Sequence, residues 1–299
     1  LLPCAAWGGD GPVVAVVFPD LGEPYRSVFG RIVEGVEGRF KGRVVNMPLA
    51  VAAAPGDLAQ EIRRNDARVV IALGRHGVSA AASLERHLPV VAGAVVNVPE
   101  GDARGMTVLS LAPDPGLLFG RLRGFLPEAR RVFAVHEPGQ SGWQIRLARE
   151  AARAAGLELV AIEVTDLKAA ARAYQNVLAG VDPRRDAIWL LQDPLSSDET
   201  TILPFLLEES WSRAIPLFSS NLAHVRRGAL FALYPDNLEL GRRLGATAQA
   251  LAAGGPGAPV GGVLPLREVM LAVNQRTAQH LGLHINPREQ GVDLVLPAQ

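Results

Sequence analysis

The stretch RVFAVHEPGQSGWQIRLAREAARAAGLELV, residues 131–160, contains the pattern that decides the fold. An apolar run at 131–136 predicts a strand, and an alanine-rich segment at 142–155 has the spacing of a helix. Gly156 ends this helix, and a second apolar run follows at 157–164. A strand, a helix and a strand in this order are typical of a parallel sheet with crossover helices.

The same alternation runs through most of the chain, and several apolar runs are hydrophobic throughout, as expected of parallel strands covered on both faces. Strands are predicted at 13–18, 43–49, 69–73, 90–96, 106–111, 131–136, 157–164, 187–192, 216–220 and 229–233. Helices are predicted at 24–39, 56–65, 77–87, 114–125, 142–155, 167–180, 199–213 and 237–253, with a short last helix in NQRTAQHLGL. This order predicts a doubly wound α/β fold.

Ten strands would be unusual in one sheet, and the loop-rich segment 97–114 offers a place to divide them. We therefore predict two doubly wound parallel-sheet lobes joined by a three-strand hinge. Residues 12–111 and 223–258 would form lobe 1, and residues 112–222 and 259–299 would form lobe 2. Because ligands bind beyond the carboxyl ends of the strands in open α/β sheets, two such lobes predict a cleft between them.

Composition excludes several classes of function. The 299 residues are 48% hydrophobic, and 30 basic residues balance 30 acidic ones, which argues against disorder and against a nucleic acid as partner. The single cysteine excludes an intrachain disulfide, and the six histidines lack the spacing of metal ligands. Dinucleotide, phosphate-loop, nucleophile-elbow and zinc-protease motifs are absent, so we expect a binding protein without cofactor, metal or catalytic residues.

The beginning of the sequence, LLPCAAWGGDG, is similar to the end of a signal peptide with cleavage after Ala6. A lipid anchor on Cys4 is the alternative, although Pro3 fits it poorly, and a gene start without a targeting role is the third. We expect a monomer that is exported to the periplasm or another extracytoplasmic compartment.

The loops after the strands contain the candidate ligand contacts. Ser141 and Gln144 have the spacing of a capping box, so this helix start could hold an anion, or Ser141 could only cap the helix. Arg75 could hold a carboxylate or be a solvated residue at the rim, and Asp193 could hold an amino group or belong to a plain turn. The predicted ligand-binding residues are Asp20, Tyr25, Gly74, Arg75, His76, Asn97, His136, Gln140, Ser141, Gly142, Asp193 and Asn221.

Four longer strings resemble one family: GMTVLSL, LRGFLPEARRVFAVHEPGQSG, RRGALFALYPDNLELGRRLGATAQALAAGG and REVMLAVNQRTAQHLGLHINP. The chain from about Val13 onward resembles ABC-type solute-binding proteins with the class I periplasmic binding fold, and within them the subgroup related to tryptophan- and tyrosine-binding proteins. The resemblance implies capture of a small solute between two lobes and its delivery to an ABC permease. A periplasmic sensing module that acts on a membrane receptor is the alternative.

Carried over from the family, Gln140, Ser141 and Gly142 would meet a ligand carboxylate. Asp193 would occupy an acidic or polar contact position, and Asn221 would follow a strand of the second lobe. The sequence departs from the family in having His136 and Glu137 in place of Tyr-Asn and Asn221 where an aspartate is common. Because a desolvated ammonium group needs a carboxylate partner, the ligand class stays open between an amino-acid-like solute and another small carboxylate.

Overall fold

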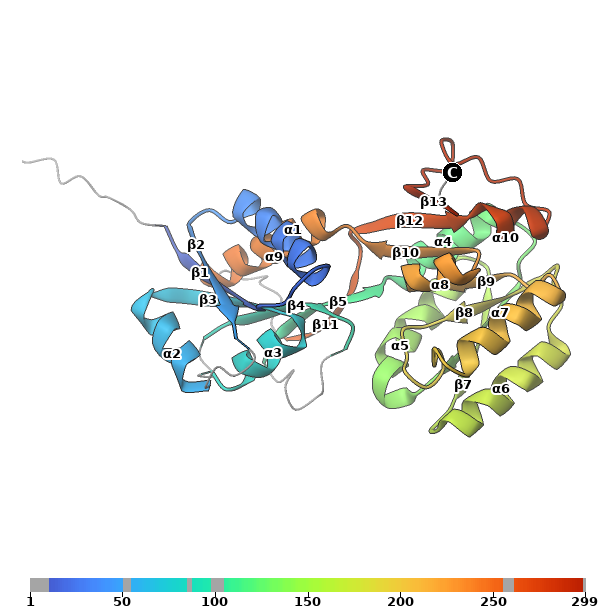
Figure 1. Cartoon of the computed structure of the whole chain (residues 1–299), viewed down its shortest axis with the longest axis horizontal. Coiled ribbons are helices and arrows are strands. Elements are labelled where there is room, and N and C mark those ends of the chain that lie inside the picture. The colour runs from blue at the N-terminus through green and yellow to red at the C-terminus, as the bar shows by residue number, and fades with distance from the viewer. Residues whose placement is uncertain (1–10, 51–54, 85–87, 98–104, 255–260, 298–299) are drawn as a thin grey trace, which may run out of the picture. The chain divides into compact units, whose positions relative to one another are not determined.

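The computed structural model describes residues 11–50, 55–84, 88–97, 105–254 and 261–297. Within them the chain forms two compact units, made of residues 1–111 with 236–264 and of residues 112–235 with 265–299 (Figure 1). The chain passes between the units three times, at Leu111–Ala112, Pro235–Asp236 and Leu264–Pro265. Cys4 and Ala6, for which the sequence predicts a lipid anchor or a cleavage site, lie outside the described residues.

Unit 1 is built on a six-stranded sheet with the order β11-β5-β4-β3-β1-β2. Its strands are β1 (Val13–Pro19), β2 (Arg43–Leu49), β3 (Ala67–Leu73), β4 (Val90–Val95), β5 (Thr107–Pro113) and β11 (Gly262–Leu266). Its helices are α1 (Tyr25–Arg39), α2 (Pro55–Arg64), α3 (Gly74–Ala82) and α9 (Asn237–Ala252). From β2 to β5 neighbouring strands run parallel, and β1, β3, β4 and β5 are mostly buried, as expected of parallel strands covered on both faces.

Unit 2 contains a seven-stranded sheet with the order β13-β12-β10-β9-β8-β6-β7, in which only the β10 and β12 pair is antiparallel among the pairs described. Its strands are β6 (Arg131–His136), β7 (Glu158–Glu163), β8 (Asp186–Leu190), β9 (Leu217–Ser219), β10 (Phe231–Pro235), β12 (Val269–Asn274) and β13 (Leu294–Leu296). Its helices are α4 (Pro115–Phe125), α5 (Pro138–Ala154), α6 (Leu167–Gly180), α7 (Ile202–Ser212), α8 (Leu222–Arg227) and α10 (Gln275–His280).

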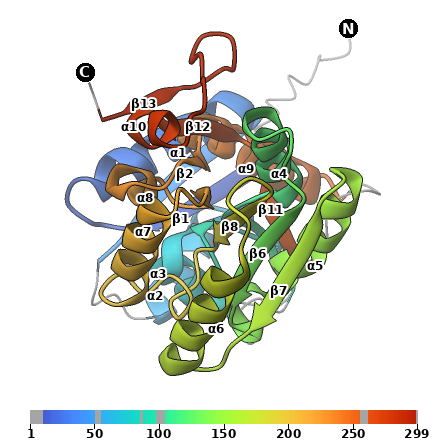
Figure 2. The same ribbon diagram turned by 90° about the vertical axis from the view of Figure 1, so that its right-hand side faces the viewer.

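The central strands of unit 2 alternate their side chains between two cores. Ala134 of β6 and Trp189 of β8 pack in a cluster with α4 and α5, whereas Phe133 and Ile188 pack with α6 and α7. Figure 2 shows these helices flanking β6 and β8. A sheet covered by helices on both faces is the doubly wound arrangement that the sequence predicts, so the fold class is confirmed.

The unit boundaries differ from the predicted lobes in two segments. Residues 223–235 were expected in lobe 1 but belong to unit 2, because β10 pairs with β9 and β12. Residues 259–299 were expected in lobe 2, but residues 261–264 cluster with unit 1, because β11 is the neighbour of β5. Sequence alone lacked this information, since strand order depends on pairing rather than on composition.

Candidate ligand-binding site

The carboxyl ends of parallel strands β6, β8 and β9 lie at one edge of the unit 2 sheet and lead to α5, to the loop before α7 and to α8. Polar side chains that water hardly reaches gather in these segments. We call them the strand-end cluster, and its members are His136, Ser141, Asp193, Ser196, Ser219, Ser220 and His224, each at most 3% exposed.

Asp193 connects the loop after β8 to the start of α5. One carboxylate oxygen, Oδ2, accepts hydrogen bonds from the Glu137 backbone N–H at 2.8 Å and from the Ser141 hydroxyl at 2.9 Å. The other, Oδ1, accepts from the backbone N–H groups of Leu195 at 3.0 Å and Ser196 at 3.1 Å. Four donors therefore satisfy this buried carboxylate within the protein. The turn after Asp193, which the sequence left as an alternative to ligand contact, is present.

Ser141 does not cap α5, which corrects the predicted capping box. The helix begins at Pro138, three residues earlier than Ser141, and Glu137 is the residue at its amino-terminal cap. Proline suits the first helical position because it has no N–H group to leave unpaired and its φ is already helical. Ser141 instead donates to Asp193, and Gln144 donates from Nε2 to the carbonyl oxygen of Pro113 at 3.0 Å.

His136 ends β6 and is 2% exposed. Neither ring nitrogen has a hydrogen-bond partner among the described residues. Burial lowers the pKa of His136 below 6.5, and the nearby charges of Glu163 and Asp193 only partly oppose this effect. The imidazole is therefore neutral at pH 7, with one donor and one acceptor nitrogen in a protein interior.

The end of β9 adds a second buried histidine. The Ser219 hydroxyl and Nδ1 of His224 lie 2.7 Å apart, and burial lowers the pKa of His224 to about 4. Asn221 caps α8 because its Oδ1 accepts from the Ala223 backbone N–H at 2.9 Å. No described residue bonds to its Nδ2, so this group can donate to a ligand.

Unit 1 has its own carboxyl edge, where β1, β3 and β4 end. Asp20 follows β1, and its exposed carboxylate has no partner among the described residues, as is also true of the phenol of Tyr25, which is 57% exposed. Asn97 follows β4, is half-buried, and already interacts with another part of the protein.

The segment Gly74 to Gly77 is the first turn of α3 rather than a loop between strand and helix. Gly74 has a φ of +70°, a conformation that glycine adopts without strain, and it lets the chain turn directly from β3 into the helix. Arg75 and His76 are exposed on this turn, and no described carboxylate pairs with the Arg75 guanidinium.

The structure thus divides the predicted residues into two groups on two sheet edges. Asp20, Tyr25, Gly74, Arg75, His76 and Asn97 lie on the edge of unit 1, and His136, Gln140, Ser141, Gly142, Asp193 and Asn221 lie on that of unit 2. Sequence reasoning did not select His224, Ser196, Ser219 or Ser220. The serines already stood in strand-end loops, but His224 had no signal, because its approach to Ser219 depends on the short helix α8.

Among the residues that the structure describes, no three histidine, cysteine, aspartate or glutamate side chains are placed to hold a metal ion. In the same residues no helix has the length and apolarity needed to cross a membrane.

Comparison with known proteins supplies the family. The model of a family described as ABC transporter substrate binding protein matches residues 49–289. A search of curated protein sequences finds no match.

Many solved structures share the fold. One is a substrate-binding protein with adhesive properties from Clostridium difficile, in its ligand-free, open structure, with a TM-score of 0.66 and 15% identity over 95% of this chain and 99% of that one. Another is an ABC domain from Streptococcus pneumonia in complex with L-Trp, with a TM-score of 0.58 and 19% identity over 96% of this chain and 100% of that one. A conserved domain protein from Vibrio cholerae has a TM-score of 0.57 and 18% identity over 95% and 99%.

At 15–19% identity the solved structures show only that the fold is shared. The family model matches most of the sequence and therefore shows the family. The two doubly wound units, with their polar strand ends, agree with both findings. The chain belongs to the family of ABC transporter substrate-binding proteins.

Proposed function

We propose that this substrate-binding protein captures a small carboxylate-bearing solute, amino-acid-like or another small carboxylate, and delivers it to an ABC permease. The family works outside the cytoplasm with a small-molecule ligand and a permease as partner. We further propose a monomer that binds no nucleic acid and performs no catalysis.

The observation that carries the ligand class is the Arg75 guanidinium, exposed in the first turn of α3 at the carboxyl end of β3. A guanidinium is suited to a carboxylate because it can donate two parallel hydrogen bonds. Asp20 and Tyr25 follow β1 at the same edge without side-chain partners among the described residues, and a carboxylate and a phenol each suit an ammonium or hydroxyl group. An amino-acid-like ligand offers both kinds of group.

In unit 2 we propose different roles for Asp193 and for its neighbours. The carboxylate of Asp193 already accepts four hydrogen bonds, so it positions the start of α5 and leaves ligand contact to others. The Ser141 hydroxyl hydrogen is directed to Asp193, and the Gln140 backbone N–H donates to the Glu137 carbonyl oxygen, so a ligand carboxylate would use Nδ2 of Asn221 instead. His136 supplies a neutral imidazole at the end of β6.

Isothermal titration calorimetry with the twenty amino acids and a set of small carboxylates tests this proposal. Mass spectrometry of protein purified under native conditions identifies solute carried from the cell. Arg75→Gln should weaken binding of a carboxylate ligand by about tenfold or more, because a charge-assisted contact contributes about 1.5–3 kcal/mol. Arg68→Gln is the matched control, since Arg68 is an exposed arginine near the opposite end of the same strand.

Equal binding by both variants would remove Arg75 from the site, and a ligand set without any carboxylate would refute the ligand class. Export through a signal sequence ending near Ala6, or anchoring through a lipid on Cys4, is also a proposal. Mass spectrometry of the amino terminus of the protein from its native membrane fraction distinguishes the two.

A further inference from the structure

A pocket lies in unit 2, and none of its residues belongs to the strand-end cluster. It has a volume of about 540 Å³, within the usual range for small-molecule sites. Helices α7, α8 and α10 and strand β13 supply the walls, which are made of Leu207, Trp211, Arg226, Arg227, Gly228, Asn274, Arg276, Thr277, Leu296 and Pro297.

The charges of this pocket are all of one sign. Arg226, Arg227 and Arg276 line it, and no carboxylate does. Among the described residues none of the three guanidinium groups forms an ion pair, and the one hydrogen bond from Arg227 goes to the backbone carbonyl oxygen of Glu199 at 3.3 Å. Glu208, on α7, is not among the residues that line the pocket. Three cations that line one pocket without an ion-pair partner among the described residues favour an anion from solution.

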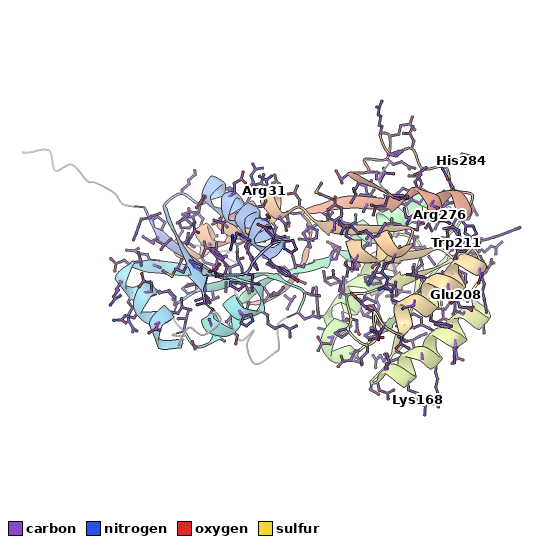
Figure 3. The ribbon with its side chains drawn as sticks, viewed as in Figure 1. Arg31, Lys168, Glu208, Trp211, Arg276 and His284 are labelled. Carbon is purple, nitrogen blue, oxygen red and sulfur yellow. The ribbon has the colours of Figure 1, made fainter. Side chains whose placement is uncertain are left out.

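The pocket also has an apolar, aromatic wall. Trp211 is 38% exposed, and the Arg276 guanidinium carbon lies 5.4 Å from the centre of its ring (Figure 3). His280 stacks on the indole at 3.8 Å between ring centres, and its Nε2 lies 2.7 Å from the Trp211 carbonyl oxygen. Because a carbonyl oxygen only accepts, this nitrogen carries the hydrogen and fixes the imidazole against the indole. Leu207, Leu296 and Pro297 complete an apolar surface beside the arginines.

We propose that this arginine and tryptophan pocket is a second binding site, for a small organic anion with a carboxylate or phosphate group on an aromatic or aliphatic body. The guanidinium groups of Arg226 and Arg276 hold the anionic group, and the ligand body packs against Trp211 and the apolar wall. The remaining polar side chains already donate hydrogen bonds within the protein. Asn274 donates to the Val225 carbonyl oxygen and Thr277 to that of Gly228, each at 2.9 Å.

Nuclear magnetic resonance of the full chain, labelled with ¹⁵N, tests the proposal with 1-naphthoate, 1-naphthyl phosphate and the uncharged 1-naphthylmethanol. Trp211→Phe identifies the indole N–H signal of Trp211. We expect saturable shifts of this signal with the two anions, and binding of the uncharged compound about tenfold weaker or worse. The anion that binds more tightly shows whether the pocket prefers a carboxylate or a phosphate group.

Arg226→Gln and Arg276→Gln should each weaken anion binding about tenfold. Arg172→Gln, an exposed arginine on α6 of the same unit, should leave it unchanged. The spectrum itself shows that each variant is folded. The proposal is wrong if neither anion binds below about 10 mM, or if charge and the two arginines make no difference. Binding of a poly-glutamate peptide that naphthoate does not displace would also overturn it, in favour of an acidic protein partner.

Discussion

Asp193 is 1% exposed, and two of the four hydrogen bonds that it accepts, from the Ser141 hydroxyl and the Ser196 backbone N–H, are buried. We expect Asp193→Ala to lower the free energy of unfolding by about 2–4 kcal/mol, because it leaves this hydroxyl and this N–H group without an acceptor in the interior. Urea unfolding followed by circular dichroism measures the change.

Ser141→Ala is the control for this prediction, because it removes one of the four donors and leaves the carboxylate with three. It should cost only about 1 kcal/mol. If Asp193→Ala costs no more than Ser141→Ala, the carboxylate does not organise this part of unit 2.

The two buried histidines predict a pH dependence of stability. Burial lowers the pKa of His136 and lowers that of His224 to about 4 in the folded protein, whereas both have a pKa near 6.5 when unfolded. The unfolded chain therefore takes up protons first as the pH falls. The free energy of unfolding should decrease between about pH 6.5 and pH 4, with His224 contributing at most about 3 kcal/mol of the loss.

Urea unfolding at a series of pH values checks this sign. His224→Gln should flatten the decrease between pH 6.5 and pH 4, even if it lowers stability at pH 7 by disturbing Ser219. His284→Gln changes an exposed histidine and should leave the slope as it is. An unchanged slope in His224→Gln would show that His224 is not held neutral by the fold.

At the residue scale the sequence predicted the place of the polar side chains better than their partners. Ser141, Asp193 and Asn221 do follow parallel strands in unit 2, as the alternating pattern predicts. The pattern could not predict the hydrogen bond between Ser141 and Asp193, because these residues lie 52 positions apart in the sequence. It therefore suggested a cap at Ser141, whereas in the structure the first turn of α5 packs against the loop after β8 and Ser141 donates to Asp193.

At the scale of helices, α1 and α9 meet through glycine. A β-carbon on Gly241 would lie 2.9 Å from Cα of Gly35 and closer still to the carbonyl oxygen of Ile32. Backbone atoms of a helix cannot move aside singly, so Gly241→Ala should push the helices apart and lower the free energy of unfolding by about 1–3 kcal/mol. Thermal and urea unfolding measure the loss.

Gly38→Ala, on α1, separates this contact from the general effect of glycine in a helix. No atom lies within 4 Å of the position that its β-carbon would take. Alanine there should stabilise the protein by up to about 1 kcal/mol, since it restricts the unfolded chain and favours the helix. Opposite signs for the two substitutions are the expected result, and a shared sign would contradict the contact.

Most helices and strands were predictable, including the short helix α10 and the short strand β9. The predicted strands 43–49 and 131–136 and the helix 167–180 have the bounds of β2, β6 and α6. The helix α8, with six residues, and the strand β13, with three, were missed, because neither segment shows a clear hydrophobic period. Asn221 and the glycine at 228 that bound α8 became meaningful only once the chain on both sides was in place.

At the scale of the whole molecule, each described hydrophobic cluster lies within one unit. One cluster joins β1, β3 and β4 of unit 1 to α2 and α3, and the others join strands of unit 2 to its own helices. Separate cores allow separate opening, because local stability follows local packing.

Hydrogen exchange followed by mass spectrometry should therefore localise two of the substitutions above. Gly241→Ala should speed exchange in β1, α1 and α9 and leave β6 and α5 close to the parent protein, since Gly241 packs only within unit 1. Asp193→Ala should do the reverse, because its four lost hydrogen bonds all belong to unit 2. Gly38→Ala is the control that should speed neither. If either destabilising substitution accelerates both sets of amides equally, the units unfold as one cooperative body despite their separate cores.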